Sequence, residues 1–174
     1  MLDRLRHVLA SQVLPTDDGF VFCFCGHGNA VALKGNDMVP TSYQDIVDVI
    51  NTEPKLRGKP KVVVFDCCQK ATPAGDQLQL PKDMIFARST AFRTAAWGQA
   101  GVGNVYSKQL AASISSYAAA YSVEDLLKLT QGQVHGERIV TRDQHGVGTR
   151  HHQIAHVDSA LGAYHLFLGD ATSQ

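Results

Sequence analysis

The sequence has no excess of either charge, because Lys and Arg together number 16 and so do Asp and Glu. Without a basic excess, the chain has no electrostatic basis for binding nucleic acid or an anionic membrane surface. It lacks an apolar run near the roughly 20 residues that a membrane-spanning helix requires, and its first residues lack the apolar core of a signal peptide. We therefore expect a cytoplasmic protein with no nucleic-acid partner and no membrane partner.

Cysteines are few, and none has zinc-type spacing. Cys23 and Cys25 form one pair, Cys67 and Cys68 form the other, and neither pair matches the C-x-x-C spacing of zinc ligands. All four lie in or at the ends of predicted buried strands, so we expect reduced thiols. A redox pair at Cys67 and Cys68 is the alternative, which is disfavoured because disulfides between adjacent residues are strained.

Histidines gather late in the chain, at His151, His152 and His156. No acidic or cysteine ligand stands among them, and a histidine cluster in a loop is more often solvated surface than a metal site. We therefore expect no metal and no cofactor.

Apolar periodicity predicts one domain of alternating helices and strands. A chain of 174 residues suits one domain and can bury roughly two thirds of its unfolded surface. Helical spacing and capping signals predict helices over residues 1–13, 41–51, 105–120 and 122–130. Apolar runs predict strands over residues 20–24, 62–65, 84–87 and 163–168. A small hairpin is expected around 34–37, and loops over 69–83, 97–104 and 131–152. This order predicts an α/β layered sandwich.

Two of the predicted strands end in reactive residues. The strand over 20–24 runs on to Cys25-Gly26-His27-Gly28, and the strand over 62–65 runs on to Asp66-Cys67-Cys68. Continuous apolar runs are typical of parallel strands buried on both faces, and chemistry in open α/β sheets collects beyond the carboxyl ends of the strands. Two adjacent parallel strands would place His27 and Cys68 side by side, which predicts a Cys/His nucleophilic site.

These segments resemble those of the caspase-fold cysteine peptidases, which include caspases, metacaspases and paracaspases. In that family a Ser- or Gly-His-Gly ends one strand, and a Q-A-C-R-G or D-C-C-H-S-G segment ends the next. The caspase histidine lies about 50 residues before the cysteine, and His27 lies 41 residues before Cys68. Further segments that resemble the family are Gly58-Lys-Pro-Lys61, Phe86-Ala-Arg-Ser-Thr90 with Ala96-Trp97, and His152-Gln-Ile-Ala-His156.

The resemblance covers nearly the whole chain and implies a three-layer caspase-like sandwich with a mostly parallel central sheet. It implies a single domain over residues 1–174, with a large-subunit-like part over 1–75 and a small-subunit-like part over 84–174. Family members carry one or two strands and a helix before the histidine strand. This chain starts too late to hold them, so we expect the opening strand or strands of the family fold to be missing.

The resemblance also implies the chemistry. Cys68 would be the nucleophile, His27 would deprotonate it and then protonate the leaving amine, and the backbone N–H groups of Gly28 and Cys68 would hold the oxyanion. Successive strand residues point opposite ways, so only one of Cys67 and Cys68 can face His27, and the D-C-C pattern puts the nucleophile second. The alternative is that Cys68 is one more buried thiol and His27 a hydrogen-bonded strand-end histidine.

Substrate binding is expected to involve Asp66, Ser89, Thr90 and Trp97. Asp66 stands two residues before the nucleophile, where caspases have Gln and where metacaspases and paracaspases, which prefer basic substrates, have Asp. The caspase arginine that grips a substrate aspartate would follow Trp97, and Gly98 stands there. We therefore expect cleavage after basic residues. Alternatively, Asp66 caps local backbone N–H groups and Trp97 only packs.

The predicted function is a cysteine endopeptidase that acts on a protein or peptide substrate. Arg88 and Arg93 are the main objection to basic specificity, because either could neutralise Asp66. The alternative from a different class is a non-catalytic caspase homologue that binds and regulates a related protease. An exposed sheet edge would invite a partner strand from a second copy of the chain, giving a homodimer, or from that protease.

Overall fold

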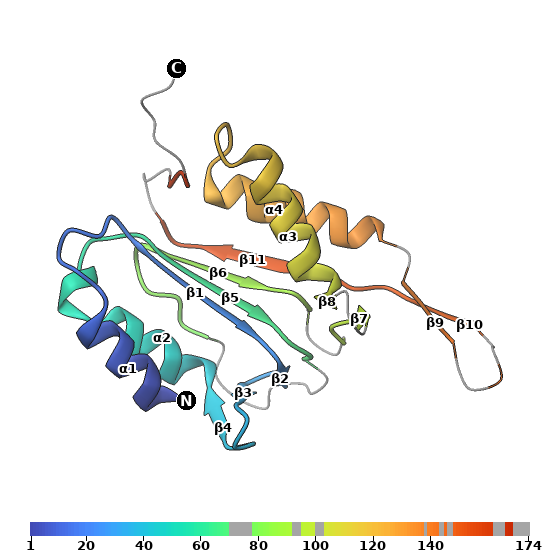
Figure 1. The fold of residues 1–174 in the computed structure, drawn as a ribbon, viewed down its shortest axis with the longest axis horizontal. Helices are drawn as coiled ribbons and strands as arrows, with labels where there is room; N and C mark the ends of the chain where they lie inside the picture. Colours follow the sequence, from blue (N-terminus) through green and yellow to red (C-terminus); the bar gives the residue numbers. More distant parts are fainter. Residues whose placement is uncertain are drawn as a thin grey trace.

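A computed structural model describes residues 1–69, 78–91, 95–99, 103–137, 139–142, 145, 148–161 and 166–168. Its centre is a four-stranded sheet with the strand order β1-β5-β6-β11 (Figure 1). These strands are β1 (Phe20–Cys25), β5 (Lys61–Asp66), β6 (Met84–Arg88) and β11 (His156–Ser159). The first three run parallel, and β11 runs antiparallel to β6. The predicted α/β fold with a mostly parallel central sheet is confirmed.

Helices cover both faces of this sheet (Figure 1). On one face lie α1 (Leu2–Ser11) and α2 (Tyr43–Asn51), and on the other lie α3 (Val105–Tyr117) and α4 (Val123–Gly136). A short 3-10 helix, η1 (Pro54–Leu56), precedes β5. The three layers are therefore two helix pairs with the sheet between them.

β5 is the strand that both helix layers bury, and all six of its residues are buried. Val63 and Phe65 belong to the core cluster that contains residues of α1 and α2, whereas Val62 and Val64 belong to the cluster that contains residues of α3 and α4. This division follows from the two-residue repeat of a strand. It confirms that the apolar run before Asp66 is buried on both faces.

Short strands flank the central sheet. A small antiparallel sheet contains β2 (His27–Gly28), β3 (Ala32–Lys34) and β4 (Pro40–Ser42). Two further antiparallel pairs are β7 (Gly98–Gln99) with β8 (Gly103–Asn104), and β9 (Ile139–Arg142) with β10 (Gly148–His151). The hairpin expected around residues 34–37 is the β3–β4 pair. The β7–β8 and β9–β10 pairs fall where loops were predicted.

Helix α2 begins later than the capping pattern at Thr41 predicted. Its N-cap is Ser42, whose Oγ accepts a hydrogen bond from the Asp45 N–H at 3.0 Å. Thr41 instead pairs with Leu33 in the β3–β4 ladder. The sheet keeps the Thr41 backbone extended, so the helix cannot start there.

Helix α4 is longer than predicted, because it was expected to end near Thr130 and it ends at Gly136. Its added turns bury Val134 completely in the core cluster beneath α3 and α4. Packing of this apolar residue continues the helix through a stretch that is otherwise polar, which is why composition alone predicted a loop there.

The strand that lies beside β6 at the edge of the described sheet is β11, whereas alternation predicted a last strand over 163–168. Residues 166–168 are not in a strand, and residues 163–165 lie outside the described part of the chain. β11 pairs with β6 from His156 opposite Arg88 to Ser159 opposite Ile85. An ion pair between Arg88 and Asp158 joins the two strands at 3.1 Å, a contact between distant residues that alternation cannot reveal.

β1 lies at an edge of the central sheet. Alternate residues of this strand, Val21, Cys23 and Cys25, are exposed, with Val21 at 51%.

No helix in the described part of the chain is long and apolar enough to cross a membrane.

Candidate active site

The register of β1 and β5 brings the two predicted dyad segments to one edge of the sheet. The last rung of the ladder pairs Cys25 with Asp66, and the Gly26 N–H donates to the Asp66 carbonyl at 3.1 Å. His27 and Cys68 each follow this rung by two residues, on strands that neighbour each other at about 4.8 Å. His27 is exposed and Cys68 is half-buried, so solvent reaches both residues at the carboxyl edge of the sheet.

The neighbouring thiols Cys67 and Cys68 lie in different environments. Cys67 is 1% exposed and belongs to the core cluster beneath α1 and α2. Burial raises the pKa of Cys67 from 9.0 to about 11, although a hydrogen bond with the Tyr43 hydroxyl at 3.3 Å acts in the opposite direction. Cys68 Sγ instead lies 3.9 Å from the carbonyl oxygen of Ala96. Cys67 is therefore a protonated core residue at neutral pH, and Cys68 is the accessible member of the pair.

Gly28 packs directly against Cys67. A Cβ atom on Gly28 would lie 2.7 Å from Cys67 Sγ and 3.2 Å from the Ala32 carbonyl oxygen, so no larger residue fits without displacement. The Asn29 N–H donates to the Ala32 carbonyl at 2.9 Å. Antiparallel pairs alternate between bonded and non-bonded, so the next pair, Gly28 with Leu33, is non-bonded. The Gly28 N–H therefore faces away from β3.

Asp66, the last residue of β5, has a buried carboxylate that contacts the first turn of α3. It is 2% exposed, and its Oδ2 accepts from the Ser107 N–H at 3.2 Å and from the Ser107 hydroxyl. Ser107 is the third residue of α3, where free N–H groups and the helix dipole favour an anion. The alternative expected Asp66 to cap local backbone N–H groups, whereas the N–H that it caps lies 41 residues away in the sequence. Its other oxygen, Oδ1, has no hydrogen-bond partner among the described residues.

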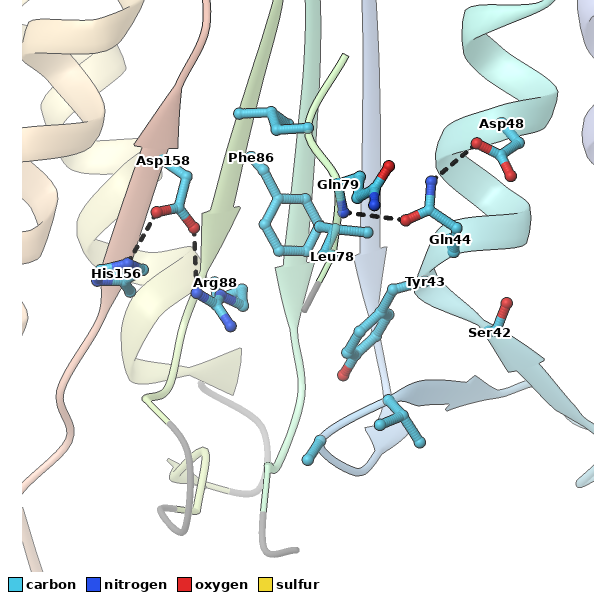
Figure 2. Close-up of a pocket in the computed structure, with 13 residues that line it drawn as sticks. Ser42, Tyr43, Gln44, Asp48, Leu78, Gln79, Phe86, Arg88, His156 and Asp158 are labelled. Carbon is cyan, nitrogen blue, oxygen red and sulfur yellow. Dashed lines mark hydrogen bonds and ion pairs between the residues drawn. The ribbon is translucent and has the colours of Figure 1, made fainter. Parts of the chain in front are cut away.

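Arg88 lies on the face of the sheet opposite to Asp66. Strand side chains alternate, so Arg88 shares the face of Phe86, which packs beneath α1 and α2. Asp66 shares the face of Val64, which packs beneath α3 and α4. Arg88 is paired with Asp158 (Figure 2) and so does not neutralise Asp66. The other arginine considered for that role, Arg93, lies outside the described residues.

Ser89 and Thr90 are fully buried beside the Cys67 backbone, at 0% exposure. The Thr90 hydroxyl donates to the Cys67 carbonyl oxygen at 2.9 Å, and the Ser89 hydroxyl lies 3.5 Å from the same atom. The Ser89 N–H donates to the Phe65 carbonyl at 2.9 Å. Both side chains thus contact the backbone that leads to Cys68.

Trp97 is half-buried, and its backbone is held by Gln153, which the sequence motifs did not identify as a site residue. The Trp97 backbone N–H donates to Gln153 Oε1 at 3.0 Å, and Gln153 Nε2 donates to the Ser89 carbonyl at 2.9 Å. The Trp97 ring stacks on His151, with ring centroids 3.8 Å apart. Gln153 is 1% exposed. It stands in the His152–His156 segment that resembles the family, but a sequence match says nothing of the atoms it joins.

The other predicted histidines have ordinary surroundings. His152 is exposed, and the His156 ring nitrogen lies 2.9 Å from Asp158. Among the described residues, no group of three or more His, Cys, Asp or Glu side chains could hold a metal ion.

A cavity of about 780 Å³ lies beside α2 on the face that carries Arg88 (Figure 2). Arg88, Asp158 and His156 stand at one end, and Gln44 stands at the other, joined to Asp48 at 2.8 Å and to the Gln79 N–H at 3.1 Å. The described residues that line the cavity include neither His27 nor Cys68. The cavity is therefore separate from the dyad segments.

Comparison with known families gives one result for most of the chain. A family model described as the caspase domain matches residues 1–163. A search of curated proteins finds no match.

Proposed function

Because the chain belongs to the caspase-domain family of cysteine peptidases, we propose that it is an endopeptidase with Cys68 as nucleophile and His27 as general base and acid. The Cys68 thiolate attacks the carbonyl carbon of the scissile peptide bond. His27 takes the thiol proton and passes it to the leaving amine, and a thioester on Cys68 remains. A water molecule that gives a proton to His27 then hydrolyses the thioester, which releases the acid product and restores the thiol.

The backbone N–H groups of Gly28 and Cys68 stabilise the oxyanion of the tetrahedral intermediates in this scheme. The Gly28 N–H faces away from β3, which supports its part in the scheme. The Cys68 N–H donates to no acceptor among the described residues, which supports the second donor.

The single observation that carries the proposal is the β1–β5 register. It sets His27 and Cys68 at equal distances along the chain beyond the Cys25–Asp66 rung, at the sheet edge where α/β enzymes carry their chemistry. The burial of Cys67 supports the choice of Cys68 as the reactive thiol.

We further propose that the substrate residue before the scissile bond is basic, with Asp66 as its partner. The Oδ1 atom of Asp66 has no partner among the described residues, and Arg88 pairs with Asp158 on the other face. A substrate aspartate at about 4 Å from this carboxylate would be repelled by on the order of 4 kcal/mol at an effective dielectric of 20. In this proposal Trp97 lines the neighbouring subsite, and Ser89 and Thr90 support the backbone at Cys67.

Fluorogenic peptides that end in Arg, Lys or Asp test both parts of the proposal. We expect cleavage of the Arg and Lys peptides, with loss of turnover in Cys68→Ala and His27→Ala. Cys23→Ser, which alters an exposed thiol on β1, is the matched control and retains activity. Turnover that persists in Cys68→Ala would refute the nucleophile, and a preference for Asp peptides would refute the specificity.

A second candidate function rests on the exposed edge of β1. Val21 is 51% exposed on this strand, and an unpaired strand edge can add a strand from a partner. In this case the chain would bind a related caspase-domain protease and regulate it without catalysis. The wild type would then cleave none of the peptides yet change the turnover of such a protease, and Val21→Lys would weaken that effect.

A further inference from the structure

We propose that Thr90 is the positioning residue of the oxyanion site, because its hydroxyl fixes the peptide group between Cys67 and Cys68. This inference rests on the proposed function and extends it to a residue that makes no contact with substrate. Thr90 Oγ1 donates to the Cys67 carbonyl oxygen at 2.9 Å. That carbonyl belongs to the same peptide group as the N–H of Cys68.

A trans peptide group is planar, so its C=O and N–H point in opposite directions and turn together. The structure has no cis peptide bond in the described chain. A hydrogen bond that holds the Cys67 carbonyl towards Thr90 therefore holds the Cys68 N–H away from Thr90. Since that N–H has no acceptor among the described residues, it stays available for the oxyanion.

Burial makes this hydrogen bond hard to replace. Thr90 is 0% exposed and Cys67 is 1% exposed, so bulk water does not reach the Cys67 carbonyl to replace the hydroxyl. Without it, the contact that remains on the Cys67 carbonyl among the described residues is the longer one from Ser89, at 3.5 Å. The peptide group would then rotate more freely about the Cys67 and Cys68 backbone dihedrals, and the N–H would leave its position for part of the time.

The position of Thr90 is fixed by the preceding residue, Ser89, whose backbone N–H and C=O are both hydrogen-bonded. The Ser89 N–H donates to the Phe65 carbonyl, and the Ser89 carbonyl accepts from Gln153 Nε2, both at 2.9 Å. Gln153 in turn holds the Trp97 N–H at 3.0 Å. Hydrogen bonds thus connect both the Cys67–Cys68 peptide and the Trp97 backbone to the Ser89–Thr90 segment. Such fixed positions are what pre-organised electrostatic stabilisation requires.

The test compares Thr90→Ser with Thr90→Ala, because the two differ by the hydroxyl alone, and measures two reactions of Cys68. A peptide aldehyde that ends in Arg forms a hemithioacetal and needs the oxyanion site. Iodoacetamide alkylates sulfur by direct displacement and does not need it. We expect Thr90→Ala to lower kcat and aldehyde affinity by about tenfold or more, since removal of an oxyanion donor costs about 100- to 1000-fold. Alkylation should stay within about twofold, with KM unchanged and Thr90→Ser near the wild type.

Thr130 provides the matched control, because it is also a buried threonine, at 0% exposure, whose hydroxyl donates to a backbone carbonyl, that of Leu126 at 2.7 Å. Thr130→Ala should lower the unfolding free energy and leave kcat unchanged. If Thr90→Ala slows alkylation as much as turnover, or behaves as Thr130→Ala does, the inference is wrong. If the wild type binds the aldehyde, and Thr90→Ala weakens this binding although no peptide is cleaved, only the proposed endopeptidase activity fails.

Discussion

Burial divides the four thiols of this chain into three environments. Cys67 is in the core, Cys68 is half-buried at the carboxyl edge of the sheet, and Cys23 and Cys25 are exposed on β1. Desolvation raises the pKa of Cys23 and of Cys25, so exposure alone does not make these two thiols reactive. Cys25 also accepts a hydrogen bond from the Asn104 side chain at 3.1 Å. Reactivity towards an alkylating reagent should therefore separate the four sites.

The first prediction concerns alkylation at neutral pH. We expect iodoacetamide to modify Cys68 first, because the thiolate is the reacting form and, in the proposed mechanism, His27 assists its formation. Cys67, with a pKa raised to about 11, should remain unmodified in the folded protein. In His27→Ala, labelling of Cys68 should slow by about tenfold, because an unassisted thiol is only partly ionised. Peptide mapping by mass spectrometry measures each site, and preferential labelling of Cys67 or Cys23 without dependence on His27 would contradict the prediction.

The second prediction concerns the contact between Gly28 and Cys67. Gly28→Ala puts a methyl group 2.7 Å from Cys67 Sγ, and overpacking of this kind costs about 1 to 3 kcal/mol of unfolding free energy. Cys67→Ala removes the sulfur that the methyl group meets. The double variant should therefore be more stable than the sum of the two single effects implies. Urea unfolding of all four proteins measures this coupling, and strictly additive effects would show that the contact is not the cause.

At the scale of secondary-structure elements, α3 depends on a carboxylate from another strand. Its N-cap residue Asn104 makes no side-chain capping hydrogen bond, and Asp66 at the end of β5 accepts from Ser107 instead. One residue therefore stabilises a helix start and carries the charge proposed to bind a basic substrate. The two roles separate when charge and hydrogen bonding are removed in turn.

The third prediction uses two variants of Asp66. Asp66→Asn keeps an oxygen acceptor for Ser107 but loses the charge, so it should fold with nearly wild-type stability and lose cleavage after Arg and Lys. Asp66→Ala loses both and should cost a further 1 kcal/mol or so of unfolding free energy, typical of a lost cap. Both should retain alkylation of Cys68. Urea unfolding and kcat/KM with Arg-ending peptides separate the effects, and an Asp66→Asn protein with unchanged specificity would leave Asp66 with the capping role alone.

The sequence predicted elements well where apolar runs are long and caps are local. The sequence placed five elements close to their observed bounds: β1, β5, β6, α1 and α3. Burial on one or two faces gives the apolar residues of such elements a clear periodicity in the sequence. β11 was missed because its place is decided by pairing with β6, and the Arg88–Asp158 contact joins residues 70 positions apart. The roles of Ser107 and Gln153 depend on equally distant partners, which no local pattern records. The dyad segments could be located because each follows an apolar run, but only β5 is buried on both faces, and the burial expected for Cys23 and Cys25 is wrong because β1 lies at the sheet edge with these residues exposed.

At the scale of the whole molecule, the buried thiol links stability to pH. The folded state raises the pKa of Cys67 from 9.0 to about 11, so the folded protein keeps a proton that the unfolded chain releases between these values. The unfolded state then binds fewer protons, and the unfolding free energy falls as the pH rises. The contribution is fully present below pH 9 and is lost by about pH 11.

The fourth prediction follows from this linkage. Cys67→Ser removes the titrating thiol and keeps a partner for the Tyr43 hydroxyl. The stability advantage of the wild type over Cys67→Ser should shrink by about 2 to 3 kcal/mol between pH 8 and pH 11, since each tenfold change in proton affinity is worth 1.36 kcal/mol. Urea unfolding at several pH values measures the difference. A constant difference across this range would mean that Cys67 titrates normally in the folded protein.

The position of β11 has a consequence for the newly made chain on the ribosome. β6 is complete at Arg88, but the strand that closes its free side ends at Ser159. With translation at about 5 to 20 residues per second, the 70 residues from Arg88 to Asp158 take roughly 4 to 14 s to synthesise. During that interval β6 carries an open row of backbone donors and acceptors, and Arg88 awaits its counter-ion. The free side of β6 in the nascent protein is therefore open to mispairing with other chains until β11 emerges.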